Sequence, residues 1–135
     1  MPPRPVLDQQ VTFLYAEHPR PCWDFYERLI GLRMVQDQGR VRIYEVAGSR
    51  AFLGLCTATG PRASEDRRVE GGVCFTFVTA DVDGWYAYLQ AAGATIPHPP
   101  APAMGGRIYH FFLHDPAGNL LEFQRFEQPD WPSPG

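Results

Sequence analysis

Glu122 is the residue whose type and position point most directly to chemistry. It lies in the second of two aromatic-rich segments, which flank the sequence Asp-Pro-Ala-Gly-Asn at positions 115–119. In such a sequence the Asp and Asn side chains bond their own backbone and the Gly supplies a left-handed residue, so residues 108–123 are predicted to form a β-hairpin. A carboxylate within an apolar strand must be paired, hydrogen-bonded, bound to a metal or directed into a polar cavity. From the residues alone, Glu122 is either a structural acid paired with Arg107 or a tyrosine, or a group that faces a ligand.

The composition indicates a folded protein without an electrostatic drive toward nucleic acid or anionic membranes. The chain has 135 residues, of which 44% are hydrophobic, and a formal net charge of −3. It contains no apolar signal core and no apolar stretch long enough to span a bilayer. Three cysteines without a CxxC pair fit a reducing compartment. We therefore expect a cytoplasmic protein.

Periodicity divides the chain into two similar halves, each with the order β-α-β-β-β. Strands are predicted at 11–15, 33–36, 40–47, 50–56, 73–78, near Thr95, 107–114 and 119–126, and helices at 21–30 and 82–92. Gly31 and Gly93 are expected to end the two helices, and Asp81 to cap the second. The segment 97–106 is expected to be a Pro-rich loop.

The predicted organisation is a tail at 1–8, a first module at 9–57, a linker at 58–70, a second module at 71–126 and a tail at 127–135, all in one structural domain. Duplicated halves of this kind are expected to close on each other. The expected fold is therefore α+β, with two tandem βαβββ modules that form a curved mixed sheet around a central cleft.

Three motifs together resemble the vicinal oxygen chelate superfamily, which comprises glyoxalases, bleomycin-resistance proteins and extradiol dioxygenases. They are Phe25-Tyr26-x-x-Leu29-Ile30-Gly31-Leu32, then Ala80-Asp81-Val82-Asp83 before a helix ending Ala91-Ala92-Gly93, and Asp115-Pro116-x-Gly118-Asn119-x-x-Glu122. The resemblance covers residues 9–126. It implies the two-module fold and a homodimer. It does not imply one activity, because the superfamily includes metal-dependent isomerases, lyases and dioxygenases as well as metal-free proteins that sequester antibiotics.

The resemblance also places four metal-binding positions in this sequence. They fall on Val11 (Gln10 in a shifted register), Gly54, Cys74 and Glu122. Glu122 is the one usual ligand for a hard divalent ion, and Cys74 would suit zinc. Because these four residues lack the donors that fix such an ion, we expect no catalytic metal; if a divalent metal is bound, Glu122 is its ligand.

The family's spacing predicts which side chains share a face with Glu122. It places Phe112 and Glu122 together on the inward face, and strand alternation then adds His110 and Gln124. A four-residue turn would instead direct Tyr109 and Phe111 inward. Both arrangements remain open at this point.

Two classes of function follow from these residues. The first is a metal-free protein that binds a small organic molecule in an aromatic cleft, with Glu122 and His110 among its polar groups. The expected ligand-binding residues are Phe13, Tyr15, Tyr44, Phe52, Cys74, Thr76, Phe112 and Gln124. The second is a lyase, isomerase, epimerase or dioxygenase of the same superfamily that is metal-dependent or uses Glu122 as general base with His110 as its partner. We favour the first class, with no cofactor and neither nucleic acid nor membrane as partner.

Overall fold

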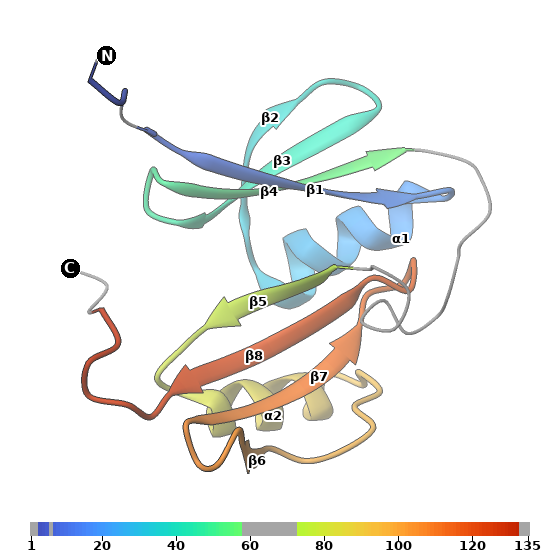
Figure 1. Cartoon of the computed structure of the whole chain (residues 1–135). Coiled ribbons are helices and arrows are strands. Elements are labelled where there is room, and N and C mark those ends of the chain that lie inside the picture. The colour runs from blue at the N-terminus through green and yellow to red at the C-terminus, as the bar shows by residue number, and fades with distance from the viewer. Residues whose placement is uncertain (1–2, 6, 58–72, 133–135) are drawn as a thin grey trace. The chain divides into compact units, whose positions relative to one another are not determined.

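The structure is a computed structural model that describes residues 3–5, 7–57 and 73–132 (Figure 1). The chain divides into two compact units, Met1–Pro61 and Arg62–Gly135. In the described residues each unit has one four-stranded mixed sheet and one helical region, in the order β-α-β-β-β. The predicted α+β class and the two βαβββ modules are thus confirmed, while the predicted linker at 58–70 lies outside the described residues. None of the described helices is long and apolar enough to cross a membrane.

The first unit builds its sheet in the order β1-β4-β3-β2. Strand β1 (Gln10–Ala16) runs parallel to β4 (Ala51–Thr57), and β3 (Val41–Ala47) lies antiparallel between β4 and β2 (Arg33–Asp37). Helix α1 (Pro19–Asp24) continues into a π-helical turn, η1 (Phe25–Ile30). The helix starts earlier than predicted because prolines fit the first turn, where no N–H is needed. It ends at Gly31, whose φ of 82° lies in the left-handed region, as predicted.

Strand alternation gives the first sheet one buried face and one more open face. Tyr44, Leu53 and Leu55 are fully buried on the helix side, where the rings of Tyr26 and Tyr44 are 6.1 Å apart. Side chains from alternate positions of β1 point away from the helix; they are Val11, Phe13 and Tyr15, with 41%, 42% and 54% exposure.

The second unit repeats this arrangement, with the order β5-β8-β7-β6 (Figure 1). Its strands are β5 (Cys74–Val78), β6 (Ala101–Ala103), β7 (Ile108–His114) and β8 (Leu120–Phe126), and its helix is α2 (Val82–Ala91). Asp81 caps α2 as predicted, because its Oδ1 accepts a hydrogen bond from the Gly84 N–H at 2.9 Å. Strand β8 lies between parallel β5 and antiparallel β7, so it holds Glu122 in the middle of the sheet.

One strand prediction was wrong. The region near Thr95 is not a strand, and the second strand of this unit is instead β6, inside the segment expected to be a Pro-rich loop. Strand β6 pairs with β7 alone, at the sheet edge, with Pro102 opposite Tyr109. Proline is tolerated there because an edge strand needs only some of its N–H groups.

The face of the second sheet that meets α2 carries an aromatic core. Phe123 stacks on both Phe77 and Phe111, with ring centroids 5.0 and 5.2 Å apart, and Trp85 of α2 lies 5.0 Å from the same ring. Alternation therefore places the even-numbered residues of β5, β7 and β8 on the opposite face. That face carries Glu122.

Candidate functional site

The turn between β7 and β8 sets the position of Glu122. Asp115 is buried, and its Oδ1 accepts hydrogen bonds from the backbone N–H groups of Ala117 and Asn119, both at 2.9 Å. Its Oδ2 accepts from the Asn119 side-chain amide at 2.9 Å, and Gly118 has a φ of 85°. This is the predicted turn chemistry. The register that it fixes places Glu122 directly opposite Phe112.

Glu122 is the centre of a polar cluster, which we define as Thr76, His110, Glu122 and Gln124. Glu122 as a whole residue is buried, with 8% exposure. Its Oε1 accepts a hydrogen bond from the Thr76 hydroxyl at 2.7 Å, and its Oε2 lies 2.5 Å from Nδ1 of His110. The Gln124 amide is satisfied when its nitrogen faces Glu122, 2.8 Å from Oε2 and 3.2 Å from Oε1. Cys74 lies at the edge of the cluster, with its Sγ 4.0 Å from Oε1.

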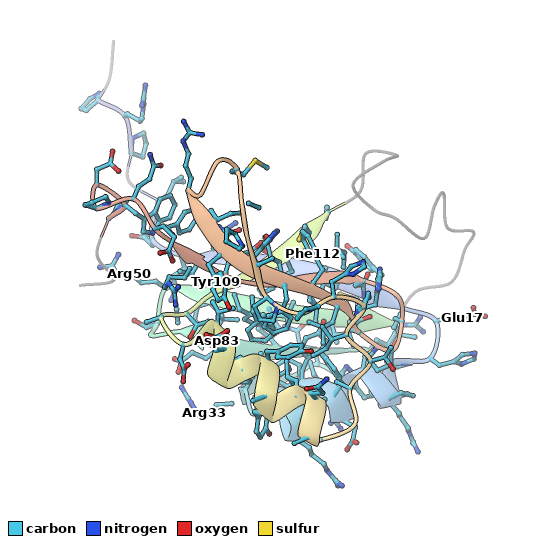
Figure 2. All side chains as sticks on the ribbon, turned by 90° about the horizontal axis from the view of Figure 1, so that it is seen from below. Glu17, Arg33, Arg50, Asp83, Tyr109 and Phe112 are labelled. Atoms are coloured by element: carbon cyan, nitrogen blue, oxygen red, sulfur yellow. The ribbon has the colours of Figure 1, made fainter. Side chains whose placement is uncertain are left out.

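The structure decides between the two arrangements left open by the sequence. His110 lies opposite Gln124, on the face of Glu122, and its ring meets that of Phe112 edge to face at 4.8 Å. Tyr109 lies on the other face, where its hydroxyl donates to Asp83 of α2 at 2.6 Å; Figure 2 shows these two residues on the helix side of the sheet. The side chain of Arg107 donates to the Met104 carbonyl at 3.1 Å instead of pairing with Glu122.

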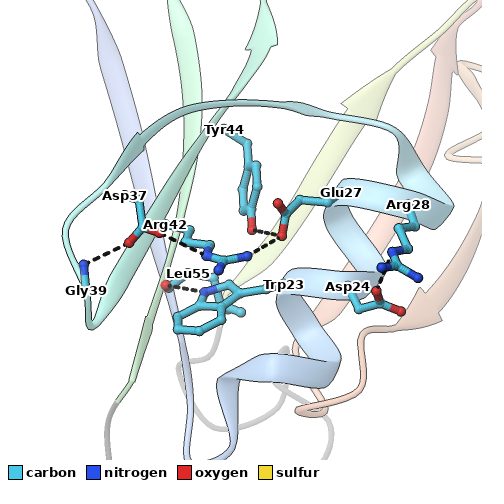
Figure 3. Close-up of polar contacts among 9 residues, drawn as sticks. All are labelled: Trp23, Asp24, Glu27, Arg28, Asp37, Gly39, Arg42, Tyr44 and Leu55. Atoms are coloured by element: carbon cyan, nitrogen blue, oxygen red, sulfur yellow. Dashed lines mark hydrogen bonds and ion pairs between the residues drawn. The ribbon is translucent and has the colours of Figure 1, made fainter.

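Tyr44 does not share a face with the other aromatic residues predicted to line the ligand site. Phe13, Tyr15 and Phe52 lie on the face of the first sheet turned away from α1. Tyr44 pairs with Leu53 on the helix side, is fully buried, and donates through its hydroxyl to Glu27 at 3.2 Å (Figure 3). Burial and the neighbouring Glu27 carboxylate raise the pKa of Tyr44. The structure thus corrects this part of the prediction.

Phe13 covers Gly54, a contact that the sequence did not predict. A Cβ built at position 54 would lie 2.4 Å from Cδ1 of Phe13 and 2.5 Å from Cε1. The central row of the first sheet is therefore Phe13–Gly54–Ile43, and the equivalent row of the second sheet is Thr76–Glu122–Phe112. The hydroxyl of Thr76 in the second unit thus corresponds to the phenyl ring of Phe13 in the first. The carboxylate of Glu122 corresponds to Gly54, which has no side chain.

The four metal positions that the resemblance implies do not fit a metal. Val11 and Gly54 have no donor side chain, and both oxygens of Glu122 already accept hydrogen bonds from the cluster. Of the four positions, only Cys74 and Glu122 carry a side chain that can coordinate a metal, whereas a protein site for zinc uses three or four such ligands. Within the described ranges, no three His, Cys, Asp or Glu side chains gather as a metal site would require.

A second group of charged residues lies in the first unit and was not found from the sequence. It borders a surface hollow of about 350 Å³ that is lined by Arg20, Trp23, Asp24, Glu27, Arg28 and Arg42. Arg42 pairs with Glu27 at 2.8 Å and lies over the Trp23 ring at 4.5 Å, and Arg28 pairs with Asp24 at 2.9 Å. The contacts of Arg42 join the helical region to β3, whereas the pair of Arg28 and Asp24 lies within the helical region. Because Asp24 and Glu27 each pair with an arginine, the charges lining the hollow largely neutralise one another.

The chain belongs to the glyoxalase/bleomycin resistance protein/dioxygenase superfamily, whose sequence model matches residues 9–123. This confirms the resemblance seen in the three motifs. The superfamily spans several activities, so membership defines the fold and not the reaction.

Solved structures with this fold include an enzyme. Lactoylglutathione lyase from Agrobacterium tumefaciens is 26% identical, with a TM-score of 0.66 over 93% of this chain and 96% of that one. A glyoxalase/bleomycin resistance protein/dioxygenase from Alicyclobacillus acidocaldarius is 21% identical, with a TM-score of 0.69 over 90% and 92%. Another from Nocardioides is 18% identical, with a TM-score of 0.65 over 98% and 91%. A comparison with curated proteins found no significant match.

Proposed function

We propose that this protein binds a small organic molecule at the polar cluster of its second unit, without a catalytic metal. The observation that carries the proposal is the buried Glu122 carboxylate, held by Thr76, His110 and Gln124 on the sheet face opposite α2. A buried charged group with its partners is often no more stabilising than apolar packing of the same volume. Its presence between the buried apolar residues Leu121 and Phe123 therefore favours recognition of a ligand over support of the fold.

The surroundings of the cluster fit a site for small molecules. Such sites combine an aromatic or apolar wall with a few convergent polar groups. Phe112 supplies an aromatic surface beside His110, and Cys74 adds a polarisable, half-buried side chain at the edge. We propose Phe112 and Cys74 as ligand contacts together with the cluster. Phe13, Tyr15 and Phe52 of the first unit stay predictions from the sequence.

A second candidate function is an enzyme that transfers a proton. The observation in its favour is the 2.5 Å contact between His110 and Glu122, because a carboxylate–imidazole pair is a common device of general acid–base catalysis. The lyase from Agrobacterium tumefaciens is the relative that supports this alternative. The unsuitable metal positions weigh against it, since metal-dependent relatives use the ion to stabilise negative charge.

We also propose a homodimer, on the family resemblance alone, and a cytoplasmic location, because three cysteines without a CxxC pair fit a reducing compartment. Sedimentation of the purified protein tests the first of these. A monomer at micromolar concentration would contradict the dimer without affecting the proposed ligand site.

An NMR screen of small aromatic compounds tests the binding proposal. We expect compounds that bind to shift the amide signals of Thr76, Phe112 and Gln124, while signals of Tyr109 and Asp83, on the other side of the sheet, change little. Shifts confined to the Asp83 side would contradict the proposal. Elemental analysis of the same sample, purified without chelator, tests the metal: a stoichiometric ion lost in Glu122→Gln would overturn the metal-free assignment.

A further inference from the structure

We infer that the atom offered to the ligand is Nε2 of His110, that Glu122 is a positioning residue, and that the ligand is a flat aromatic molecule with a hydroxyl group. This inference rests on the proposed function and adds the chemistry of recognition. It also reverses the roles of these two residues in the enzyme alternative predicted from the sequence, in which Glu122 is the general base and His110 its partner.

The first step concerns the acceptor capacity of Glu122. An ionised carboxylate offers about four lone-pair positions. The Thr76 hydroxyl occupies one on Oε1, His110 occupies one on Oε2, and the Gln124 amide reaches both oxygens. The Glu122 side chain is only 11% exposed. With its acceptor positions largely filled by the protein, Glu122 has little capacity left for a ligand.

The second step concerns the tautomer of His110. An ionised carboxylate can only accept hydrogen bonds, so the ring nitrogen that contacts it has to carry the proton. The 2.5 Å contact between Oε2 of Glu122 and Nδ1 of His110 therefore places a proton on Nδ1. In the neutral ring, the proton on Nδ1 makes Nε2 an acceptor. Within the part of the chain that the structure describes, Nε2 makes no hydrogen bond. In this form the ring presents an oriented acceptor, and a ligand hydroxyl can be its donor.

The third step concerns what lies beside that acceptor. Phe112 meets the His110 ring edge to face at 4.8 Å, and both side chains are partly exposed on the same face of β7. Val78, beyond Gln124 in the sheet, is 58% exposed and extends the apolar surface. An aromatic ring can pack on Phe112 while its hydroxyl donates to Nε2. A phenol-like ligand matches this combination, because it supplies one hydrogen-bond donor and a flat apolar body.

Two measurements on the whole chain test the inference. The first uses the nitrogen chemical shifts of His110 to determine its tautomer in the free protein. The second compares the binding of 2-naphthol with that of 2-methoxynaphthalene, which has nearly the same shape but no hydroxyl donor. Both are made on the unmodified protein, on Glu122→Gln, and on Asp83→Asn as a control. The control makes the same carboxylate-to-amide change beside a ring side chain of β7, but on the other face.

In the unmodified protein we expect the Nδ1–H tautomer and about fivefold tighter binding of 2-naphthol, the ratio that one net hydrogen bond of about 1 kcal/mol produces. An amide at position 122 can accept or donate toward Nδ1, so Glu122→Gln removes the tautomer preference. We expect this variant to lose most of the naphthol advantage while keeping its affinity for 2-methoxynaphthalene. Asp83→Asn is expected to change neither.

Several results would overturn the inference. A proton on Nε2 in the free protein, whether the ring is neutral or charged, would do so even if Glu122→Gln fails to fold. Equal affinities for the two compounds at this face would reject the hydroxyl contact but leave the proposed function standing. Failure of both compounds to bind would reject the ligand class, while the wider screen continues to test binding itself. Equal weakening of both compounds by Glu122→Gln, with an unchanged tautomer, would show that Glu122 is only structural.

Discussion

Adding a single methyl group at Gly54 tests the contact that distinguishes the first sheet from the second. The Cβ of an alanine would lie 2.4 Å from Cδ1 of Phe13, well inside the distance that carbon atoms tolerate, so the ring has to move. Phe13 is already 42% exposed, and it can therefore swing toward solvent without displacing the backbone. This movement exposes the part of the Phe13 side chain that is now buried, and the stabilisation from that burial is lost.

The expected energies follow from that exposure. Full burial of a Phe side chain is worth roughly 1.5–3 kcal/mol, so loss of the buried half of Phe13 costs about 1–2 kcal/mol. Alanine is more favourable than glycine in a strand by about 0.5–1 kcal/mol. We expect Gly54→Ala to lower the free energy of unfolding by about 0.5–1 kcal/mol. In a Phe13→Ala background the same change is expected to raise it by about 0.5–1 kcal/mol, a coupling of about 1–2 kcal/mol.

Urea denaturation of the four proteins, unmodified, each single variant and the double variant, measures this coupling. Tyr15→Ala is the matched control, since Tyr15 lies on the same strand and face but pairs with Cys56 rather than Gly54. Its combination with Gly54→Ala is expected to be additive. Additive effects in the Phe13 pair as well would refute the argument that the ring occupies the space above Gly54.

Four further expectations concern other parts of the molecule. Asp115→Ala removes three hydrogen bonds from a buried turn and is expected to lower the free energy of unfolding by about 2–3 kcal/mol; a loss below 0.5 kcal/mol in chemical denaturation would contradict the role of the turn. Glu122→Ala orphans the donors of the cluster and leaves a cavity, so it is expected to lower the melting temperature clearly more than Glu122→Gln; equal shifts would argue against the hydrogen bonds described here. Because burial raises the pKa of Tyr44, the folded state holds that proton more tightly than the unfolded state; stability is expected to fall as pH rises above about 10, and less so in Tyr44→Phe when the denaturation midpoint is followed with pH. Zinc, nickel or manganese ions are expected to leave the melting temperature nearly unchanged, whereas a specific site at a hundredfold excess over its dissociation constant would add about 2.7 kcal/mol.

Features encoded locally were predictable from the sequence, and those that depend on distant pairing were not. The Asp115 turn and the Asp81 cap use side chains that bond the backbone within four residues, so the sequence reveals them. The face shared by His110 and Glu122 follows from the same hairpin once its register is known. Strand β6 has three residues and no periodicity to detect.

Neither the sheet face on which Tyr44 lies nor the contact of Phe13 with Gly54 could be predicted from the residues next to them in the sequence. Tyr44 and Phe52 lie on opposite faces because of the pairing between β3 and β4, which shifts register between Glu45 and Ala47. The contact of Phe13 with Gly54 depends on parallel pairing between strands about forty residues apart in the chain. The Glu27–Arg42 pair likewise joins a helix to a strand, a contact that no spacing rule anticipates.

The different central rows of the two sheets also bear on how such a protein changes over evolutionary time. In a duplicated architecture, a row of Phe13, Gly54 and Ile43 in one copy and of Thr76, Glu122 and Phe112 in the other indicates that the copies have specialised. The hydrogen bonds that Glu122 accepts from Thr76 and His110 lie within the second copy, and the contact of Phe13 with Gly54 lies within the first. Each copy can therefore be varied in its own library, and unfolding measurements on combined variants then show whether their effects on stability add.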